Sequence, residues 1–148
     1  MGNTGEAQLR NLTEAVEETV KQISNFNLQI KATGAFPSKR NARVLWLDVR
    51  DGRGSLQKLN KILETECAKR DFAKETRNFK AHLTIARLRE PHKSKELVEE
   101  HLSNDFDSAE FTVSEITIYE SQLLKSGSIY SVVSKHKFKR ELTADECG

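Results

Sequence analysis

Residues 79–87 read Phe-Lys-Ala-His-Leu-Thr-Ile-Ala-Arg, an apolar run that one imidazole and one hydroxyl interrupt. Because side chains two positions apart in a strand point to the same face, His82 and Thr84 are predicted to lie side by side. Leu83 and Ile85 are then expected on the opposite face, under the helices. A histidine can exchange a proton near neutral pH and a threonine hydroxyl can donate to a phosphoryl oxygen, so the pair suits phosphate chemistry. The pattern alone leaves a structural interpretation open, in which Thr84 serves strand propensity and a neighbour satisfies His82.

The chain on either side of this run predicts a small α+β sandwich. Apolar residues recur every three or four positions in some stretches and alternate with polar residues in others, which indicates helices and strands. The expected helices are residues 5–24, 55–70 and 94–102, and the expected strands are residues 26–32, 44–49, 79–88, 110–119 and 128–138. Asn3 with Glu6 and Ser55 are expected to cap the first two helices, and Gly34 with Pro37 to end the first strand. This order favours a mixed or mainly antiparallel sheet with helices on its outer faces.

The length and charge of the chain predict one ordinary domain. It has 148 residues and a formal net charge of +2. We expect residues 1–140 to form the domain and residues 141–148 to be a disordered tail. The longest purely apolar run, residues 44–47, is far shorter than the roughly 20 residues of a membrane span, so a cytoplasmic protein without membrane contact is expected. Cys67 and Cys147 lack partners at metal-ligand spacing, so we expect reduced thiols, Cys67 being a buried hydrophobe, and no metal or cofactor.

Several short motifs along the chain carry a resemblance to a known family. They are Gly34-Ala35-Phe36-Pro37, Arg43-Val44-Leu45-Trp46, Arg77 with the run 79–87, and Ser121 with Gly127 and Tyr130. In order and spacing they resemble the two-histidine (2H) phosphoesterases, most closely the bacterial and archaeal RNA 2′,3′-cyclic phosphodiesterases once called 2′-5′ RNA ligases. The resemblance covers most of the chain.

This resemblance implies a two-lobed fold in which two His-x-Thr motifs face each other across a cleft. One histidine would act as general base and the other as general acid. The implied reaction is hydrolysis of a terminal 2′,3′-cyclic phosphate of RNA to a 2′-phosphomonoester, without a cofactor. By resemblance, His82 and Thr84 are the second motif and the partner is an RNA or nucleotide with a cyclic phosphate end.

The chain departs from the family pattern because it contains a single His-x-Thr. His92, His101 and His136 are not followed by threonine two positions later. We therefore expect an N-terminally truncated member that lacks the opening strand and the first motif, with impaired hydrolysis. An exposed sheet edge would also favour a homodimer. The alternative function is a non-catalytic module that binds an AMP-like nucleotide or an RNA end.

Five further residues are candidate substrate contacts, each with a second interpretation. Arg87 is a phosphate ligand by resemblance, yet strict alternation puts it on the face opposite His82, where it would make a structural ion pair unless a β-bulge re-aims it. Lys80, in phase with His82, is a competing cation. Trp46 would stack on a base or pack in the core, and Tyr130 would line the cleft or pack. Ser121 fits the family pattern or a turn.

Two basic stretches could guide an RNA backbone if both flank the cleft. They are Lys39, Arg40 and Arg43, and the run Lys135, His136, Lys137, Lys139 and Arg140. The alternative is an ordinary solvated surface.

Overall fold

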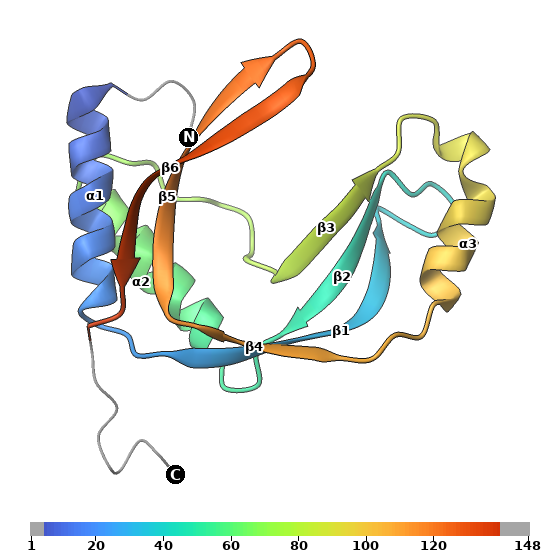
Figure 1. Cartoon of the computed structure of the whole chain (residues 1–148), viewed down its shortest axis with the longest axis horizontal. Coiled ribbons are helices and arrows are strands. Elements are labelled where there is room, and N and C mark those ends of the chain that lie inside the picture. The colour runs from blue at the N-terminus through green and yellow to red at the C-terminus, as the bar shows by residue number, and fades with distance from the viewer. Residues whose placement is uncertain (1–4, 140–148) are drawn as a thin grey trace. The chain divides into compact units, whose positions relative to one another are not determined.

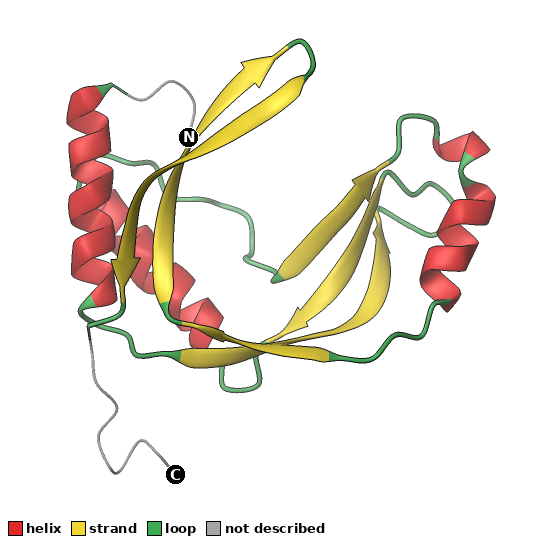
Figure 2. Cartoon of the chain, viewed as in Figure 1, coloured by secondary structure: helices red, strands yellow, loops and turns green. Residues whose placement is uncertain are grey.

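The structure is a computed structural model that describes residues 5–139. Its helices are α1 (Glu6–Val20), α2 (Ser55–Ala68), the 3₁₀ turn η1 (Pro91–Lys93) and α3 (Lys95–Ser103) (Figure 1). Its strands are β1 (Phe26–Phe36), β2 (Val44–Arg50), β3 (His82–Arg87), β4 (Ala109–Val113), β5 (Glu115–Leu124) and β6 (Gly127–Lys137) (Figure 2). The predicted α+β class is confirmed.

The described residues fall into two compact units, and each has its own sheet. The first unit contains residues 5–26, 58–78 and 113–139, and the second contains Asn27–Gln57 and Phe79–Thr112. Strands β5 and β6 form a two-stranded sheet, while β3, β2, β1 and β4 form a four-stranded sheet in that order.

In the first unit, the amphipathic face of α1 packs on the β5–β6 hairpin. Val16 and Val20 are buried against Ile118 of β5, and Phe138 packs around them. Val16 and Val20 are four positions apart, the apolar spacing from which the helix over residues 5–24 is predicted. Cys67 is buried on α2, as expected, and this burial raises the pKa of its thiol.

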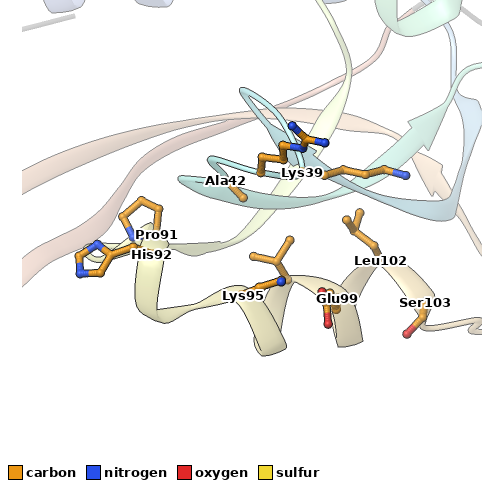
Figure 3. Close-up of a pocket in the computed structure, with 10 residues that line it drawn as sticks. Lys39, Ala42, Pro91, His92, Lys95, Glu99, Leu102 and Ser103 are labelled. Atoms are coloured by element: carbon orange, nitrogen blue, oxygen red, sulfur yellow. The ribbon is translucent and has the colours of Figure 1, made fainter.

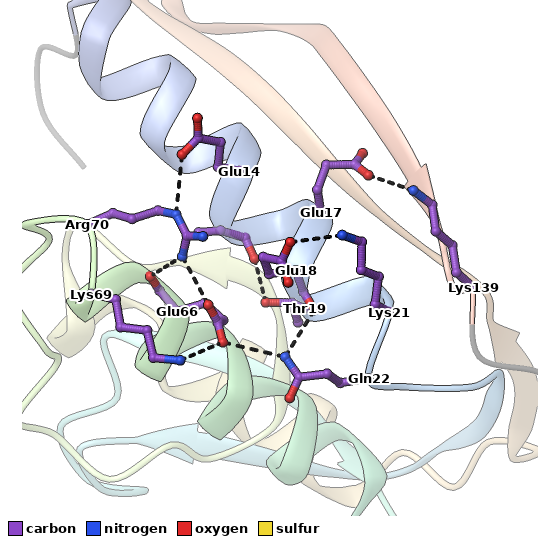
Figure 4. A network of polar contacts seen from close by, with 11 residues as sticks. Glu14, Glu17, Glu18, Thr19, Lys21, Gln22, Glu66, Lys69, Arg70 and Lys139 are labelled. Atoms are coloured by element: carbon purple, nitrogen blue, oxygen red, sulfur yellow. Dashed lines mark hydrogen bonds and ion pairs between the residues drawn. The ribbon is translucent and has the colours of Figure 1, made fainter.

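A charged network joins α1 to α2 beside this core (Figure 4). The nearly buried carboxylate of Glu66 accepts hydrogen bonds from Arg70 Nη1 at 3.0 Å and from Lys69 Nζ at 3.1 Å. Gln22, just after α1, donates a longer bond, 3.5 Å, to the same carboxylate, and Arg70 also faces Glu14 of α1 at 3.5 Å. The bonds from Arg70 and Lys69 hold the pKa of Glu66 below its usual value.

We expect Glu66→Gln to destabilise the protein by about 1–3 kcal/mol at neutral pH, because Arg70 loses a charged acceptor in a partly buried site. Since the pKa of Glu66 is lower in the folded state, its contribution is present above its unfolded pKa and disappears as pH falls through the folded pKa. Urea unfolding at a series of pH values should therefore show the two proteins converging in acid. Glu18→Gln, which removes a solvent-exposed pair with Lys21, is the control and should change little. A stability gap that does not vary with pH would contradict this account.

In the second unit, α3 covers one face of the four-stranded sheet. Ala42, Leu45 and Val98 are buried together there, with Ala35 of β1 and Ala86 of β3 packed around them. Strands β1 and β2 pair in antiparallel fashion, as do β2 and β3.

Several predicted boundaries were wrong, for local reasons. Gly5 is the N-cap of α1, and the predicted cap Asn3 lies outside the described residues. Ser55 is the first residue of α2, not its cap, because the Asp51 carboxylate accepts the backbone N–H groups of Ser55 and the two residues after it, at 2.7–3.2 Å. Gly34 lies inside β1 and does not end it. The expected strand 110–119 is two strands, and the expected disordered tail lies outside the described residues.

Candidate functional site

A β-bulge in β3 interrupts the strict alternation expected for residues 79–87. Leu45 pairs with Ala86 and Trp46 pairs with Thr84, which leaves Ile85 without a partner on β2. The prediction that Ile85 faces the core is wrong, because its side chain is 51% exposed and Ala86 instead packs under α3. The bulge therefore changes the phase of the strand between Thr84 and Ala86.

The phase change brings Arg87 to the same face as the His-x-Thr pair. Arg87 pairs with Val44, and Thr84 pairs with Trp46. Val44 and Trp46 are two positions apart on β2, so their side chains and those of their partners share a face. His82 joins them because it is two positions from Thr84. Of the two alternatives for Arg87, the structure therefore shows the β-bulge that places it on the face of His82, and its role as a phosphate ligand remains a prediction.

We call this face of the second unit, opposite α3, the open face. By register and alternation its residues are Gly34 and Phe36 of β1, Val44, Trp46 and Asp48 of β2, and His82, Thr84 and Arg87 of β3. His82, Arg87 and Phe36 are exposed, and Thr84 and Trp46 are half-buried. A proton-exchanging group, a hydroxyl, a guanidinium and two aromatic rings thus occur on one surface.

Trp46 lies flat against its cross-strand neighbour Gly34. A Cβ atom placed on Gly34 would come within 2.1 Å of Trp46 Cζ2, so only glycine leaves room for the indole. On the solvent side, Lys80 Nζ lies 4.9 Å from the centroid of the indole ring, a cation–π contact. Trp46 is therefore held on the open face between a backbone and a cation and does not pack under α3.

The imidazole of His82 is oriented by its own strand. Its Nδ1 lies 2.7 Å from the carbonyl oxygen of Lys80, and because a carbonyl oxygen only accepts, Nδ1 carries the proton of this hydrogen bond. In the neutral ring Nε2 is then the basic nitrogen. Because the His82 side chain is exposed on the same face as Thr84, its Nε2 can accept a proton from a substrate group or, once protonated, donate one.

His101, which was not a candidate from the sequence, contacts strands β1 and β2 from the α3 side of the sheet. It lies on α3, is only 9% exposed, and places Nε2 3.0 Å from the carbonyl oxygen of Gly34 and 3.1 Å from that of Trp46. Both oxygens accept, so Nε2–H is shared between the two strands at the point where the indole covers the glycine. The helical position of His101 beside Val98 and Leu102 was the only sequence signal for a buried imidazole.

We expect His101→Ala to lower the stability of the protein by about 1–3 kcal/mol, because two carbonyl groups lose a buried donor. The emission of Trp46, the only tryptophan, should change as well, since its backbone loses this anchor. Denaturant unfolding followed by tryptophan fluorescence measures both effects. His92→Ala, which removes an exposed imidazole, is the control and should leave the midpoint unchanged. Equal midpoints for the two variants would contradict the anchoring role.

The remaining candidates lie in the other unit. Ser121 of β5 and Tyr130 of β6 are direct cross-strand neighbours. Ser121 lies within a strand and not in a turn, and Tyr130 is 67% exposed and does not pack in a core. The structure therefore brings these two side chains together, and separately brings together the candidates on the open face.

The predicted basic stretch 135–140, of which Arg140 lies outside the described residues, is only partly a free cationic surface over residues 135–139. His136 is buried, and its Nδ1 contacts the Glu17 carboxylate while its Nε2 lies 2.8 Å from the hydroxyl of Ser134. Lys139 Nζ donates to the other oxygen of Glu17 at 2.8 Å. The hydrogen bonds from Lys139 and His136 lower the pKa of Glu17. His136 therefore ties β6 to α1 and does not contact a backbone phosphate from this position.

Residues 5–139 contain no group of three or more His, Cys, Asp or Glu side chains placed to hold a metal ion. None of the helices in this part of the chain combines the length and apolar character needed to cross a bilayer.

Comparison with known proteins gives a consistent result. A family model described as the 2′-5′ RNA ligase superfamily matches residues 4–123. The RNA 2′,3′-cyclic phosphodiesterase of Methanothermobacter thermautotrophicus is 32% identical over 133 residues, which cover 88% of this chain and 70% of that protein. The protein of the same name from Aquifex aeolicus is 30% identical, over 91% of this chain and 72% of that protein.

Solved structures share the fold. A Thermus thermophilus protein superposes with a TM-score of 0.68 at 20% identity, covering 95% of this chain and 75% of its own. Escherichia coli LigT, solved in complex with 3′-AMP, superposes with a TM-score of 0.58 at 19% identity, covering 87% of this chain and 70% of its own.

Proposed function

Because this chain belongs to the 2′-5′ RNA ligase superfamily, we propose that it acts on RNA that ends in a 2′,3′-cyclic phosphate, hydrolysing the ring to a 2′-phosphomonoester. The match to the family model confirms the resemblance that the motifs of this chain indicate. Relatives at about 30% identity carry the name RNA 2′,3′-cyclic phosphodiesterase. The observation that carries the proposal is the open face, where the bulge aligns Arg87 with His82 and Thr84.

In the proposed reaction, a water oxygen forms a bond to phosphorus and the bond from phosphorus to O3′ breaks. One proton leaves the water and another reaches O3′, so the products are a 2′-phosphate and a free 3′-hydroxyl. His82 Nε2 is suited to one of these proton transfers because Nδ1 is already committed to the Lys80 carbonyl. Thr84 and Arg87 would donate to the phosphoryl oxygens, whose charge rises in the transition state.

The aromatic part of the open face suits the nucleoside that carries the phosphate. The indole of Trp46 offers a flat platform, which is sequence-tolerant because every base has a π-face. Lys80 would be displaced from the indole, or would pair with a phosphate while the base takes its place. LigT, with the same fold, is solved with 3′-AMP, a nucleotide with its phosphate on the ribose.

A second candidate function is nucleotide or RNA-end binding without turnover. The observation that favours it is the single His-x-Thr in the sequence, since hydrolysis by this route uses two proton transfers. Thr84, Arg87 and Trp46 would bind the phosphate and the base in either case.

Incubation of the whole chain with a short RNA that ends in a 2′,3′-cyclic phosphate distinguishes the two functions. Phosphorus NMR should show the cyclic phosphate signal replaced by that of a 2′-phosphomonoester. The same RNA with a 3′-hydroxyl end is the control for phosphate release from other positions. Tight binding of the cyclic-phosphate RNA with no change in its phosphorus spectrum would overturn hydrolysis in favour of the binding module.

A further inference from the structure

The second unit contains a cavity on the α3 side of its sheet, away from the open face. It has a volume of about 710 Å³ and lies between the β1–β2 loop and one side of η1 and α3 (Figure 3). The lining residues are Lys39, Arg40, Ala42, Pro91, His92, Lys95, Val98, Glu99, Leu102 and Ser103. Ala42 and Val98 belong to the core under α3, whereas His82 and Thr84 are on the opposite face of the sheet. The cavity is therefore separate from the proposed catalytic residues.

The rim of this cavity carries more positive than negative side chains. Lys39, Arg40 and Lys95 are basic side chains, and His92 adds an imidazole. The only lining carboxylate is Glu99. Within residues 5–139 none of these five side chains makes an ion pair or a hydrogen bond, even though Lys95 and Glu99 are one helical turn apart. The rim therefore has an excess of positive charge, because three cations and an imidazole accompany a single carboxylate. A ligand with at least two negative charges would neutralise this excess.

The floor of the cavity is apolar. Ala42 and Val98 are buried, and Leu102 and Pro91 are half-buried beside them. The volume lies within the roughly 300–1,000 Å³ that small-molecule sites occupy. A ligand that fits both parts has an anionic group at the rim and a flat or apolar group that reaches the floor, and Ser103 offers a hydroxyl to its polar edge.

From these features we propose that the cavity between the β1–β2 loop and α3 binds a nucleotide, with its phosphates at Lys39, Arg40 and Lys95 and its base or ribose over Ala42 and Val98. The nucleotide is either free or one unit of an RNA strand, since the two share this chemistry. The proposal does not depend on hydrolysis at the open face, because no residue of the open face lines the cavity.

The test is titration calorimetry of the whole chain with two probes that lack a cyclic phosphate: ADP and a 5′-phosphorylated tetraribonucleotide with a 3′-hydroxyl end. The variant Lys39→Gln/Lys95→Gln should weaken binding roughly tenfold or more. Its matched control is Lys58→Gln/Lys61→Gln, which removes two exposed charges from α2, outside the cavity, and should bind as the unaltered chain does. Glu99→Gln should tighten binding, an effect that misfolding cannot produce.

The two probes distinguish a site for a free nucleotide from a site for an RNA strand. Binding of ADP with this dependence on Lys39 and Lys95 supports a free-nucleotide site. Binding of the tetranucleotide alone supports a strand site. The log of its affinity decreases linearly with the log of the salt concentration, and this dependence should become less steep by about 1.4 in the cavity variant. Binding in the cavity should leave Trp46 fluorescence unchanged, because the indole lies across the sheet, and a fluorescence change that persists in the cavity variant reports binding on the open face instead. The proposal is overturned if neither probe binds, or if the cavity variant and the α2 control bind equally.

Discussion

Replacing His82 by alanine is expected to slow hydrolysis of a 2′,3′-cyclic phosphate RNA end by roughly 10²–10⁴-fold, the contribution of one positioned acid or base. The side chain is exposed, and its one hydrogen bond is to the carbonyl of Lys80, so its loss should barely change stability. Initial rates under saturating RNA, measured for both proteins by separation of cyclic and opened ends, give the ratio directly.

Two controls separate proton transfer from a general disturbance of the site. Added imidazole should restore part of the lost rate in His82→Ala and none in the unaltered chain, since it can occupy the space of the missing ring. Thermal unfolding of the two proteins should coincide. If His82→Ala retains the full rate, His82 takes no part in proton transfer, and this conclusion does not depend on whether the chain binds RNA.

Gly34→Ala is expected to displace the indole of Trp46 and so to weaken nucleotide binding on the open face. The added Cβ would stand 2.1 Å from Cζ2 and 2.3 Å from Cη2, far inside van der Waals contact, so the ring must leave the strand surface. Loss of one base-stacking platform should cost about 1–3 kcal/mol of binding free energy. The overpacking itself should cost about 1–3 kcal/mol of stability. Fluorescence emission should move to longer wavelength as the only tryptophan enters water.

Gly52→Ala provides the matched control for this variant. Gly52 also lies in the second unit, its φ is not positive, and no atom lies within 4 Å of a Cβ built on it. Stability, emission and affinity should all remain those of the unaltered chain. If Gly34→Ala binds 3′-AMP as tightly as Gly52→Ala does, Trp46 is not the surface that holds the base.

Much of the fold was predictable because it rests on periodicity. The α1 face and strand β2 follow directly from apolar residues spaced for a helix and from a short run that combines β-branched and aromatic residues, and the structure places both where expected. The shared face of His82 and Thr84 was also predictable, since side chains two positions apart lie on one face in any regular strand. These inferences need only local spacing.

The errors occurred where one residue depends on a partner distant in sequence. Gly34 has the composition of a strand end, yet it continues β1 because the indole of Trp46 needs the space that its missing side chain leaves. The face of Arg87 stayed open in the sequence, and Ile85 was expected in the core, because nothing local marks Ile85 as a bulge. Neither feature changes the spacing of apolar and polar residues in the sequence. Both become visible only once it is known which strand residues pair.

The bulge at Ile85 means that two different spacings of threonine and arginine can form the same open face. Deleting Ile85 would leave a regular strand in which Trp46 still pairs with Thr84 and Leu45 with Ala86, so Ala86 would stay under α3 and Arg87 would stay on the face of Thr84. In divergent members of such a family, one residue between the threonine and the arginine in a regular strand would therefore be equivalent to two residues with a bulge. The pairing with the neighbouring strand is then a better guide to a shared site than the spacing in the sequence.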